Sequence, residues 1–246
     1  MRALLVGRYE ARLARDATDL AQAMHLRNLS FRNGRAAAQD SDAFDDACLH
    51  ILIRDTSSNR LVCCYRVQLL AGGRDLGRSY SAQFYDLSRL AGFGGPLLEL
   101  GRFCVHPDHP DPDILRLAWG ALARLVDDVQ ATLLFGCSSF DGAHGPDHDA
   151  ALMHLRAAHL APDIWRPLPL AQHVYDYGVR LAGQNADPRA AMRAMPPLLR
   201  TYLAMGGWVS DHAVVDSDLN TLHVFTAVEI AKIPPARARA LRAIAG

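Results

Sequence analysis

The sequence predicts an α/β (α+β) fold in which a mixed, mostly antiparallel central sheet is flanked by helices. The expected elements follow the order helix, strand, strand, strand, helix, strand, helix, and the first two strands form a hairpin. This order lacks the strict alternation of strand and helix that a doubly wound parallel sheet requires. Neither a dinucleotide-binding glycine pattern nor a P-loop follows any expected strand, which argues against nucleotide-binding enzymes.

Length and composition are those of a globular protein that can bury a substantial core: 246 residues, of which 50% are hydrophobic and 21% charged. We expect residues 1–183 to form that core and residues 184–246 to form a C-terminal extension packed on it, within one continuous domain. The formal net charge is zero, so charge gives no reason to expect a nucleic acid partner. The five cysteines form no CxxC pattern, which indicates reduced thiols in a cytoplasmic protein.

In the first half of the chain, apolar spacing predicts a helix over Asp16–Phe31 with Asp16 as its N-cap. Leu49–Asp55 and Leu61–Leu70 then read as two strands of a hairpin. The glycine-rich segment Asp75–Gly95 is expected to be a loop with short structure inside it. Leu97–Val105 reads as the third strand.

The second half is expected to contain further helices and strands. The predicted elements are a helix over Ile114–Ala131, a buried strand over Leu133–Ser139, helices over Asp149–Ala158 and Pro196–Met205, and apolar segments over Trp208–Val215 and Leu222–Val228. The last two segments flank a polar turn.

The strand Leu97–Val105 carries a glutamate and an arginine inside an apolar run. Burying Glu99 is costly unless it is paired, hydrogen-bonded or facing a cavity. Gly101 is a natural place for a β-bulge, which would bring Glu99 and Arg102 to the same side and free a backbone N–H. Such a site offers a base, a cation and an oxyanion donor. A purely structural Glu–Arg pair at a sheet edge explains the spacing equally well.

Three other features add polar groups. Arg27 and Phe31 are four residues apart and share a helix face, Asp42 and Asp45 flank an aromatic residue in an acidic loop, and Arg66 interrupts an apolar strand. Each alone is more often a solvated face or a routine ion pair. Together they indicate a polar pocket for a charged small molecule.

The set Arg27-x3-Phe31, Asp42-Ala43-Phe44-Asp45, Arg66 and Glu99-x2-Arg102 resembles the signature of the acyl-homoserine-lactone synthases, which use acyl carrier protein thioesters on a GNAT-like fold. The chain as a whole more closely resembles the L-ornithine Nα-acyltransferases of bacterial ornithine-lipid synthesis. The stretches that carry this resemblance are Phe84–Ser88, Leu98–Asp108, Leu134–Phe140, Pro196–Leu199, Gly207–Val209 and Asp216–Thr221.

The resemblance implies transfer of a (3-hydroxy)acyl group from acyl carrier protein to the α-amino group of L-ornithine, the first step of ornithine-lipid synthesis. Glu99, its pKa raised by burial, is then the candidate general base. Arg102 would orient Glu99 or bind the carboxylate of the amino acid. The family fold further implies that two strands diverge to admit the pantetheine arm of the donor. The candidate substrate-binding residues at that gap are Phe103, Cys104, Ser138 and Ser139.

The segment His106–Asp113 takes the place of the glycine-rich loop that holds the pyrophosphate of coenzyme A in the usual GNAT enzyme. It contains three prolines, three aspartates and no glycine, which disfavours coenzyme A and favours a carrier-protein donor. Asp42 and Asp45 either hold the side-chain ammonium of ornithine or pair internally with Arg27 and Arg66, and we favour the pairing. No metal or other cofactor is expected, because the histidines lie in loops without ligand spacing.

Other functions stay open. One is N-acylation of a different amino acid or synthesis of an acyl-homoserine lactone, and another is an acyl-carrier or acyl-chain binding protein without activity. The sequence has no signal peptide and no apolar run long enough to span a membrane, so we expect a cytoplasmic protein that can contact the surface of the inner membrane.

Overall fold

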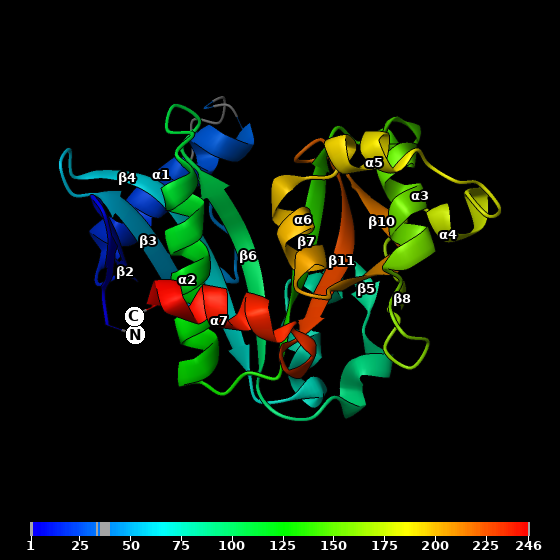
Figure 1. The fold of residues 1–246 in the computed structure, drawn as a ribbon, viewed down its shortest axis with the longest axis horizontal. Coiled ribbons are helices and arrows are strands. Elements are labelled where there is room, and N and C mark those ends of the chain that lie inside the picture. The colour runs from blue at the N-terminus through cyan, green and yellow to red at the C-terminus, as the bar shows by residue number, and fades with distance from the viewer. Residues whose placement is uncertain (1, 33, 35–39, 246) are drawn as a thin grey trace. The chain divides into compact units, whose positions relative to one another are not determined.

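A computed structural model describes residues 2–32, 34 and 40–245 of the chain (Figure 1). These residues form two compact units, each built from segments that are far apart in the sequence. The first unit contains Met1–Leu69, Leu98–Ala131 and Pro235–Gly246, and the second contains Leu70–Leu97 and Thr132–Pro234. These units do not correspond to the expected core of residues 1–183 and extension of residues 184–246, and that division stays a prediction.

The first unit is built on five neighbouring strands in the order β1-β2-β3-β4-β6. Their bounds are β1 Leu4–Val6, β2 Tyr9–Leu13, β3 Leu49–Asp55, β4 Arg60–Leu70 and β6 Leu97–Val105. The pairs β1–β2, β2–β3 and β3–β4 are antiparallel. The predicted hairpin of β3 and β4 is confirmed, and so is the strand β6 with its predicted bounds.

The contacts between β4 and β6 also keep an antiparallel register. His106 N–H donates to Val62 O at 2.8 Å, the Sγ atoms of Cys64 and Cys104 lie 3.5 Å apart, and the rings of Tyr65 and Phe103 stack 5.2 Å apart. The residue number rises on one strand as it falls on the other, which only antiparallel strands allow.

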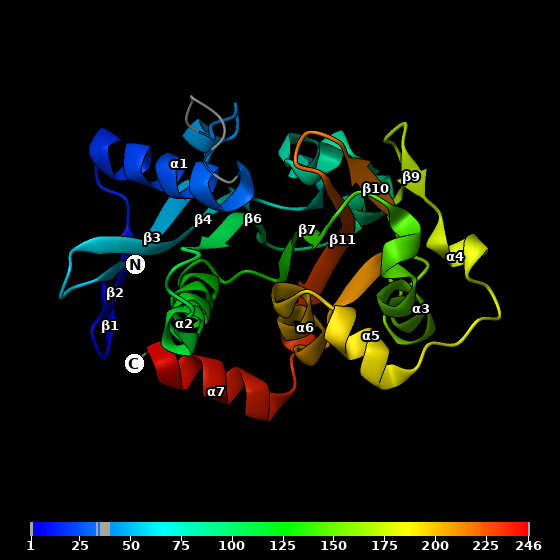
Figure 2. The same ribbon diagram turned by 90° about the horizontal axis from the view of Figure 1, so that it is seen from above.

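Helices cover the two faces of this sheet (Figure 2). They are α1 Ala17–Arg32 on one face, and α2 Pro112–Asp128 with α7 Pro235–Ala245 on the other. Neighbouring residues of β4 show the same division, because Cys64 Sγ contacts Ala23 O of α1 at 3.6 Å and Tyr65 OH donates to Ala118 O of α2 at 3.0 Å. We refer to these faces as the α1 face and the α2 face.

Several elements of this unit differ from the predictions. The hairpin of β1 and β2 was not expected, because the strands are only three and five residues long and carry little periodicity. The helix α2 begins two residues before the predicted start, because the Asp111 side chain accepts a hydrogen bond from Asp113 N–H and caps it. The predicted N-cap of α1 is confirmed, since Asp16 Oδ1 accepts from Asp19 N–H at 2.9 Å.

The second unit contains four neighbouring antiparallel strands in the order β7-β11-β10-β9. Its strands are β7 Leu133–Asp141, β9 Val174–Tyr175, β10 Trp208–Asp216 and β11 Thr221–Glu229, with a separate pair of β5 Tyr85–Asp86 and β8 Leu168–Pro169. Its helices are α3 Asp149–Ala158, α4 Tyr177–Arg180, α5 Pro188–Ala194 and α6 Pro197–Ala204. Aromatic residues such as Tyr85, Phe135 and Phe225 fill its core.

The predicted α+β class is confirmed: antiparallel strands dominate and helices flank them. Helices α4, α5 and α7 were not expected, because each is short or carries arginines and alanines in place of a clear apolar stripe. Within the described part of the chain, no helix combines the length and the apolar character needed to cross a bilayer.

Candidate active site

The centre of the site is a break in the alternation of β6 at Gly101 and Arg102. Arg102 has a φ of 51°, the left-handed conformation that costs a residue with a side chain on the order of 1–3 kcal/mol. Beyond this point Phe103 stacks on Tyr65, on the α2 face. A Cβ on Gly101 would nevertheless lie 3.5 Å from Arg66 Nε, so Gly101 points to the α1 face.

Arg102 reaches the same α1 face, because its Nη2 donates to Asp42 Oδ2 at 3.0 Å and Asp42 also binds Arg66. Two consecutive residues of the strand therefore point to one side. A β-bulge at Gly101 would produce this arrangement, and the left-handed conformation of Arg102 supports it; the bulge itself stays a prediction. Regular alternation back along β6 from Gly101 would put Glu99 on the α1 face too, so the prediction of a base and a cation side by side is compatible with this geometry.

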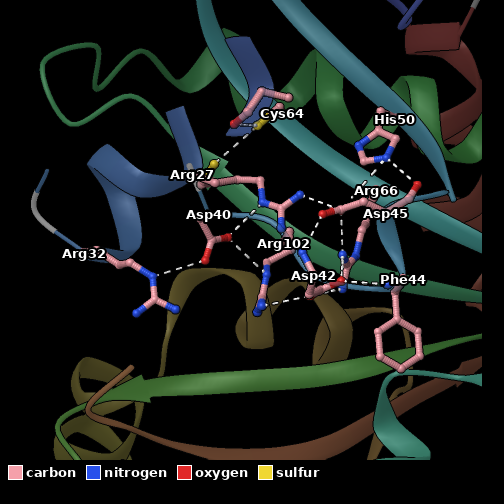
Figure 3. A network of polar contacts seen from close by, with 12 residues as sticks. Arg27, Arg32, Asp40, Asp42, Phe44, Asp45, His50, Cys64, Arg66 and Arg102 are labelled. Carbon is pink, nitrogen blue, oxygen red and sulfur yellow. Dashed lines mark hydrogen bonds and ion pairs between the residues drawn. The ribbon is translucent and has the colours of Figure 1, made fainter. Parts of the chain in front are cut away.

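At this break, three carboxylates and four guanidinium groups form a network of ion pairs, which Figure 3 shows from close by. Asp45 Oδ1 accepts from Arg27 Nη1 at 2.7 Å and from Arg66 Nη1 at 2.6 Å. Asp42 accepts from both Nη atoms of Arg66, at 2.5 and 2.9 Å. The members of the network are Arg27, Arg32, Asp40, Asp42, Asp45, Arg66 and Arg102.

Burial and pairing act against each other in this network. Burial alone would raise the pKa of the Asp45 carboxyl, but hydrogen bonds from Arg27, from Asp42 N–H and from Arg66 outweigh it and lower the pKa to about 2. Asp42 follows the same pattern, with burial opposed chiefly by Arg66, and its pKa is lowered. Asp42 and Asp45 therefore stay charged at neutral pH and are fixed counter-charges for Arg27, Arg66 and Arg102.

Asp42 and Asp45 thus pair internally with Arg27 and Arg66, which is the alternative that we favoured. Each oxygen of the two carboxylates accepts a hydrogen bond from an arginine or from a backbone N–H. This pairing ties the loop that carries the aspartates to α1 and to β4. A role for them in substrate binding stays a prediction.

Glu99 is 4% exposed, and its charge affects the pKa of the Cys48 thiol. Burial raises the pKa of the Cys48 thiol to about 11, Arg66 lowers it and Glu99 raises it further. Cys48 follows the acidic loop directly. Arg66 and Glu99 therefore act on the pKa of the same thiol in opposite directions.

The other predicted site residues lie in different surroundings. Phe31 packs at the border of a small apolar cluster that contains Cys104. Phe103 lies on the α2 face between Tyr65 and Trp119, whose ring centroid is 6.3 Å away. Ser138 is buried and Ser139 exposed on β7 of the second unit. Substrate contacts for these side chains stay predictions.

Sequence reasoning missed Asp40, Arg32 and His50 as members of the site. His50 Nε2 lies 2.9 Å from Asp45 O, and Asp40 contacts three arginines. The signal for Asp40 was its place in the acidic loop, but nothing in the spacing distinguished it from the exposed Asp46. Among the described residues, no three His, Cys, Asp or Glu side chains cluster in a way that could hold a metal ion.

The loop between β6 and α2 has no backbone N–H to offer an anion. Pro107, Pro110 and Pro112 lack one. The intervening N–H groups donate within the loop, Asp108 N–H to His106 Nδ1 at 3.2 Å, His109 N–H to His106 O at 3.0 Å and Asp111 N–H to His109 O at 2.9 Å.

Comparisons with known proteins identify the fold and the family of the chain. Residues 23–120 match the model of the acetyltransferase (GNAT) domain. The fold is shared with an N-acyl amino acid synthase from uncultured soil microbes, at a TM-score of 0.54 over 92% of this chain and 94% of that chain, although only 11% of residues are identical.

Two curated relatives are named L-ornithine N(alpha)-acyltransferase. The protein of Rhodobacter capsulatus is 35% identical over 88% of each chain. That of Brucella abortus is 31% identical over 93% of this chain and 86% of its own. Identity of this extent over nearly whole chains, on a GNAT fold, means that the chain belongs to the L-ornithine Nα-acyltransferase family.

Proposed function

We propose that this acyltransferase moves a (3-hydroxy)acyl group from acyl carrier protein to the α-amino group of L-ornithine, the first step of ornithine-lipid synthesis. The observation that carries the proposal is the break in β6, which brings Arg102 beside a fixed array of charges; alternation along the strand supports a position of Glu99 on the same face. The names of the curated relatives support ornithine as the acceptor.

The reaction forms a C–N bond and breaks a C–S bond. The α-amino group arrives as an ammonium, so one proton leaves before attack and a second leaves after it. Glu99 accepts a proton, directly or through a water molecule, and the departing thiolate takes one up. Arg102 orients Glu99 or binds the α-carboxylate of the amino acid through its planar fork. Backbone N–H groups near the break stabilise the oxyanion of the tetrahedral intermediate.

The loop between β6 and α2 supports acyl carrier protein over coenzyme A as the donor. An adenosine pyrophosphate needs backbone N–H groups or cations at that position, and the N–H groups of this loop are absent or used internally. A carrier protein presents only the phosphate of its pantetheine arm. We place the reaction in the cytoplasm near the inner membrane, because a long acyl chain drives the product into a bilayer.

The test is incubation of the purified protein with 3-hydroxyacyl carrier protein and a panel of amino acids, followed by mass spectrometry of N-acyl products. We expect N-acylornithine to dominate, and the same acyl group on coenzyme A to react far more slowly. Product from another amino acid but not from ornithine would overturn the acceptor. A lactone product would place the chain with the signalling enzymes, and no product at all would favour an acyl-binding protein.

Glu99→Gln tests the mechanism in the same assay. Loss of the general base is expected to lower kcat by roughly 10²–10⁴-fold. The matched control is Glu10→Gln on β2, which removes a carboxylate of the same unit that is not part of the arginine–aspartate network. A Glu99→Gln enzyme as fast as the Glu10→Gln enzyme would contradict the role of Glu99.

A further inference from the structure

Asp40 is a buried carboxylate at the centre of three arginine contacts. Its Oδ2 lies 2.9 Å from Arg27 Nε and 3.3 Å from Arg102 Nε, and its Oδ1 lies 3.2 Å from Arg32 Nε. Figure 3 shows it between the two arginines of α1 and the arginine of β6. Only 3% of its side chain is exposed.

We infer that Asp40 is a positioning residue of the acyltransferase, which holds the Arg102 guanidinium in place by tying it to the end of α1. This role rests on the proposed function, because it acts through Arg102. Asp40 Oδ2 forms an ion pair with the Nε of Arg102 at 3.3 Å, while Asp42 Oδ2 accepts a hydrogen bond from its Nη2, so the two carboxylates attract two different nitrogens of one planar group. Attraction at two points opposes rotation of the guanidinium group.

The backbone conformation of Arg102 also supports this role of Asp40. Arg102 stands in the left-handed conformation, and such a residue persists only when its surroundings determine it from several sides. With Arg102 relaxed to an extended conformation, regular alternation would put Glu99 and Arg102, three residues apart, on opposite faces of β6. The contacts with Asp40 and Asp42 oppose this relaxation, and Asp40 is itself fixed by Arg27 and Arg32.

A plain counter-ion role for Asp40 is the alternative, and the same unit contains a matched case of it. Asp19 on α1 accepts from Arg12 at 2.5 and 2.9 Å and from Arg54 at 3.2 Å, and 8% of its side chain is exposed. It is therefore also a buried aspartate between arginines. None of the contacts described for Asp19 reaches β6.

The first test compares Asp40→Asn with Asp19→Asn. Both variants are expected to lower Tm, because each leaves buried guanidinium groups short of a counter-charge. At a temperature where both are folded, Asp40→Asn should lower kcat/KM for the amino acid by ~10-fold or more, while Asp19→Asn should change it less than about twofold. Equal losses of kcat/KM in the two variants would overturn the positioning role.

Asp40→Glu keeps the charge and moves the carboxylate by one methylene group, so it keeps the inference testable if Asp40→Asn does not fold. If Asp40 is a positioning residue, Asp40→Glu should lower kcat/KM nearly as much as Asp40→Asn does. Its Tm should nevertheless stay close to that of the natural protein. Full activity of Asp40→Glu would mean that negative charge alone suffices. In an Arg102→Lys background, adding Asp40→Asn should lower kcat/KM only slightly further. If the losses of kcat/KM from the two substitutions were fully additive, Asp40 would not act through Arg102.

A readout without substrate separates this inference from the proposed function. The Nε–H of Arg102 can be followed by ¹⁵N nuclear magnetic resonance and assigned by its loss in Arg102→Lys. We expect its exchange with solvent to accelerate in Asp40→Asn and to stay unchanged in Asp19→Asn. Unchanged exchange in Asp40→Asn would overturn the inference, while absence of N-acyl product from the natural protein would overturn only the proposed function.

Discussion

Arg66 and Arg102 donate hydrogen bonds to the same oxygen atom, Asp42 Oδ2, at 2.9 and 3.0 Å. The two arginines come from neighbouring strands and carry like charges that repel at this separation. Asp42 therefore compensates two cations at once. The side chain of Asp42 is 22% exposed, whereas that of Arg66 is only 3% exposed. Asp42 is therefore the member of this pair that lies nearer to solvent.

Replacing Asp42 by asparagine should destabilise the first unit strongly. The change leaves Arg66 with Asp45 and Arg102 with Asp40 as their charged partners, but it removes the carboxylate that the two guanidinium groups share, which costs about 3 kcal/mol. Equilibrium unfolding in urea measures this loss. Asp46→Asn, an exposed aspartate of the same loop, serves as the control and should change the midpoint little. Similar midpoints for the two variants would contradict the bridging role of Asp42.

The pKa of Asp45, lowered to about 2 against burial by its arginine and backbone partners, predicts acid sensitivity. A carboxyl whose pKa is lower in the folded state contributes stability that is fully present above the unfolded pKa, near 4, and is lost as the pH falls through 2. The contribution is about 2 kcal/mol. Asp45→Asn should be less stable than the natural protein at pH 7, with a difference that shrinks toward pH 2. A difference that does not depend on pH would refute this assignment.

His223 on β11 predicts a second acid transition at higher pH. Burial lowers its pKa to about 4, Asp216 raises it and His212 lowers it further; Tyr85 OH lies 3.0 Å from its Nδ1. Since the unfolded pKa is near 6.5, stability should fall as the pH drops from 6.5 to 4, by about 3 kcal/mol in all.

Unfolding of His223→Gln followed by tryptophan fluorescence checks this transition. The variant should lose little stability between pH 6.5 and 4, whereas His173→Gln, an exposed histidine of the same unit, should keep the loss of the natural protein. If His223→Gln loses as much stability between pH 6.5 and 4 as the natural protein, this pH dependence arises from another group.

Replacing either of two glycines by alanine should reduce stability by very different amounts. A Cβ on Gly101 would meet Arg66 Nε at 3.5 Å, an ordinary contact, so Gly101→Ala should cost less than about 1 kcal/mol. A Cβ on Gly73 would lie 2.2 Å from Leu90 O, a backbone atom that cannot move aside, so Gly73→Ala should cost about 3 kcal/mol. Thermal unfolding measures both. Equal Tm values for the two variants would contradict the predicted close approach at Gly73.

Much of the fold was predictable because its signals are local. The hairpin of β3 and β4, the strand β6 and the helix α3 follow from runs of apolar residues between polar turns. The short hairpin at the N-terminus was not predictable in this way, because a three-residue strand has no measurable period. It forms because β2 pairs with β3, whose partner residues lie 38–46 positions further along the chain.

The sequence by itself determined that Glu99, Gly101 and Arg102 stand together in an apolar strand, and it placed Arg27, Asp42, Asp45 and Arg66 among the site residues. The tertiary structure alone decided which cation meets which carboxylate, and it added Asp40. The reason is distance along the chain: 60 residues separate Arg102 from Asp42, and no local period reports a contact of that span. Only when β4, β6 and α1 pack together do these charges share one buried space, where each must find a partner.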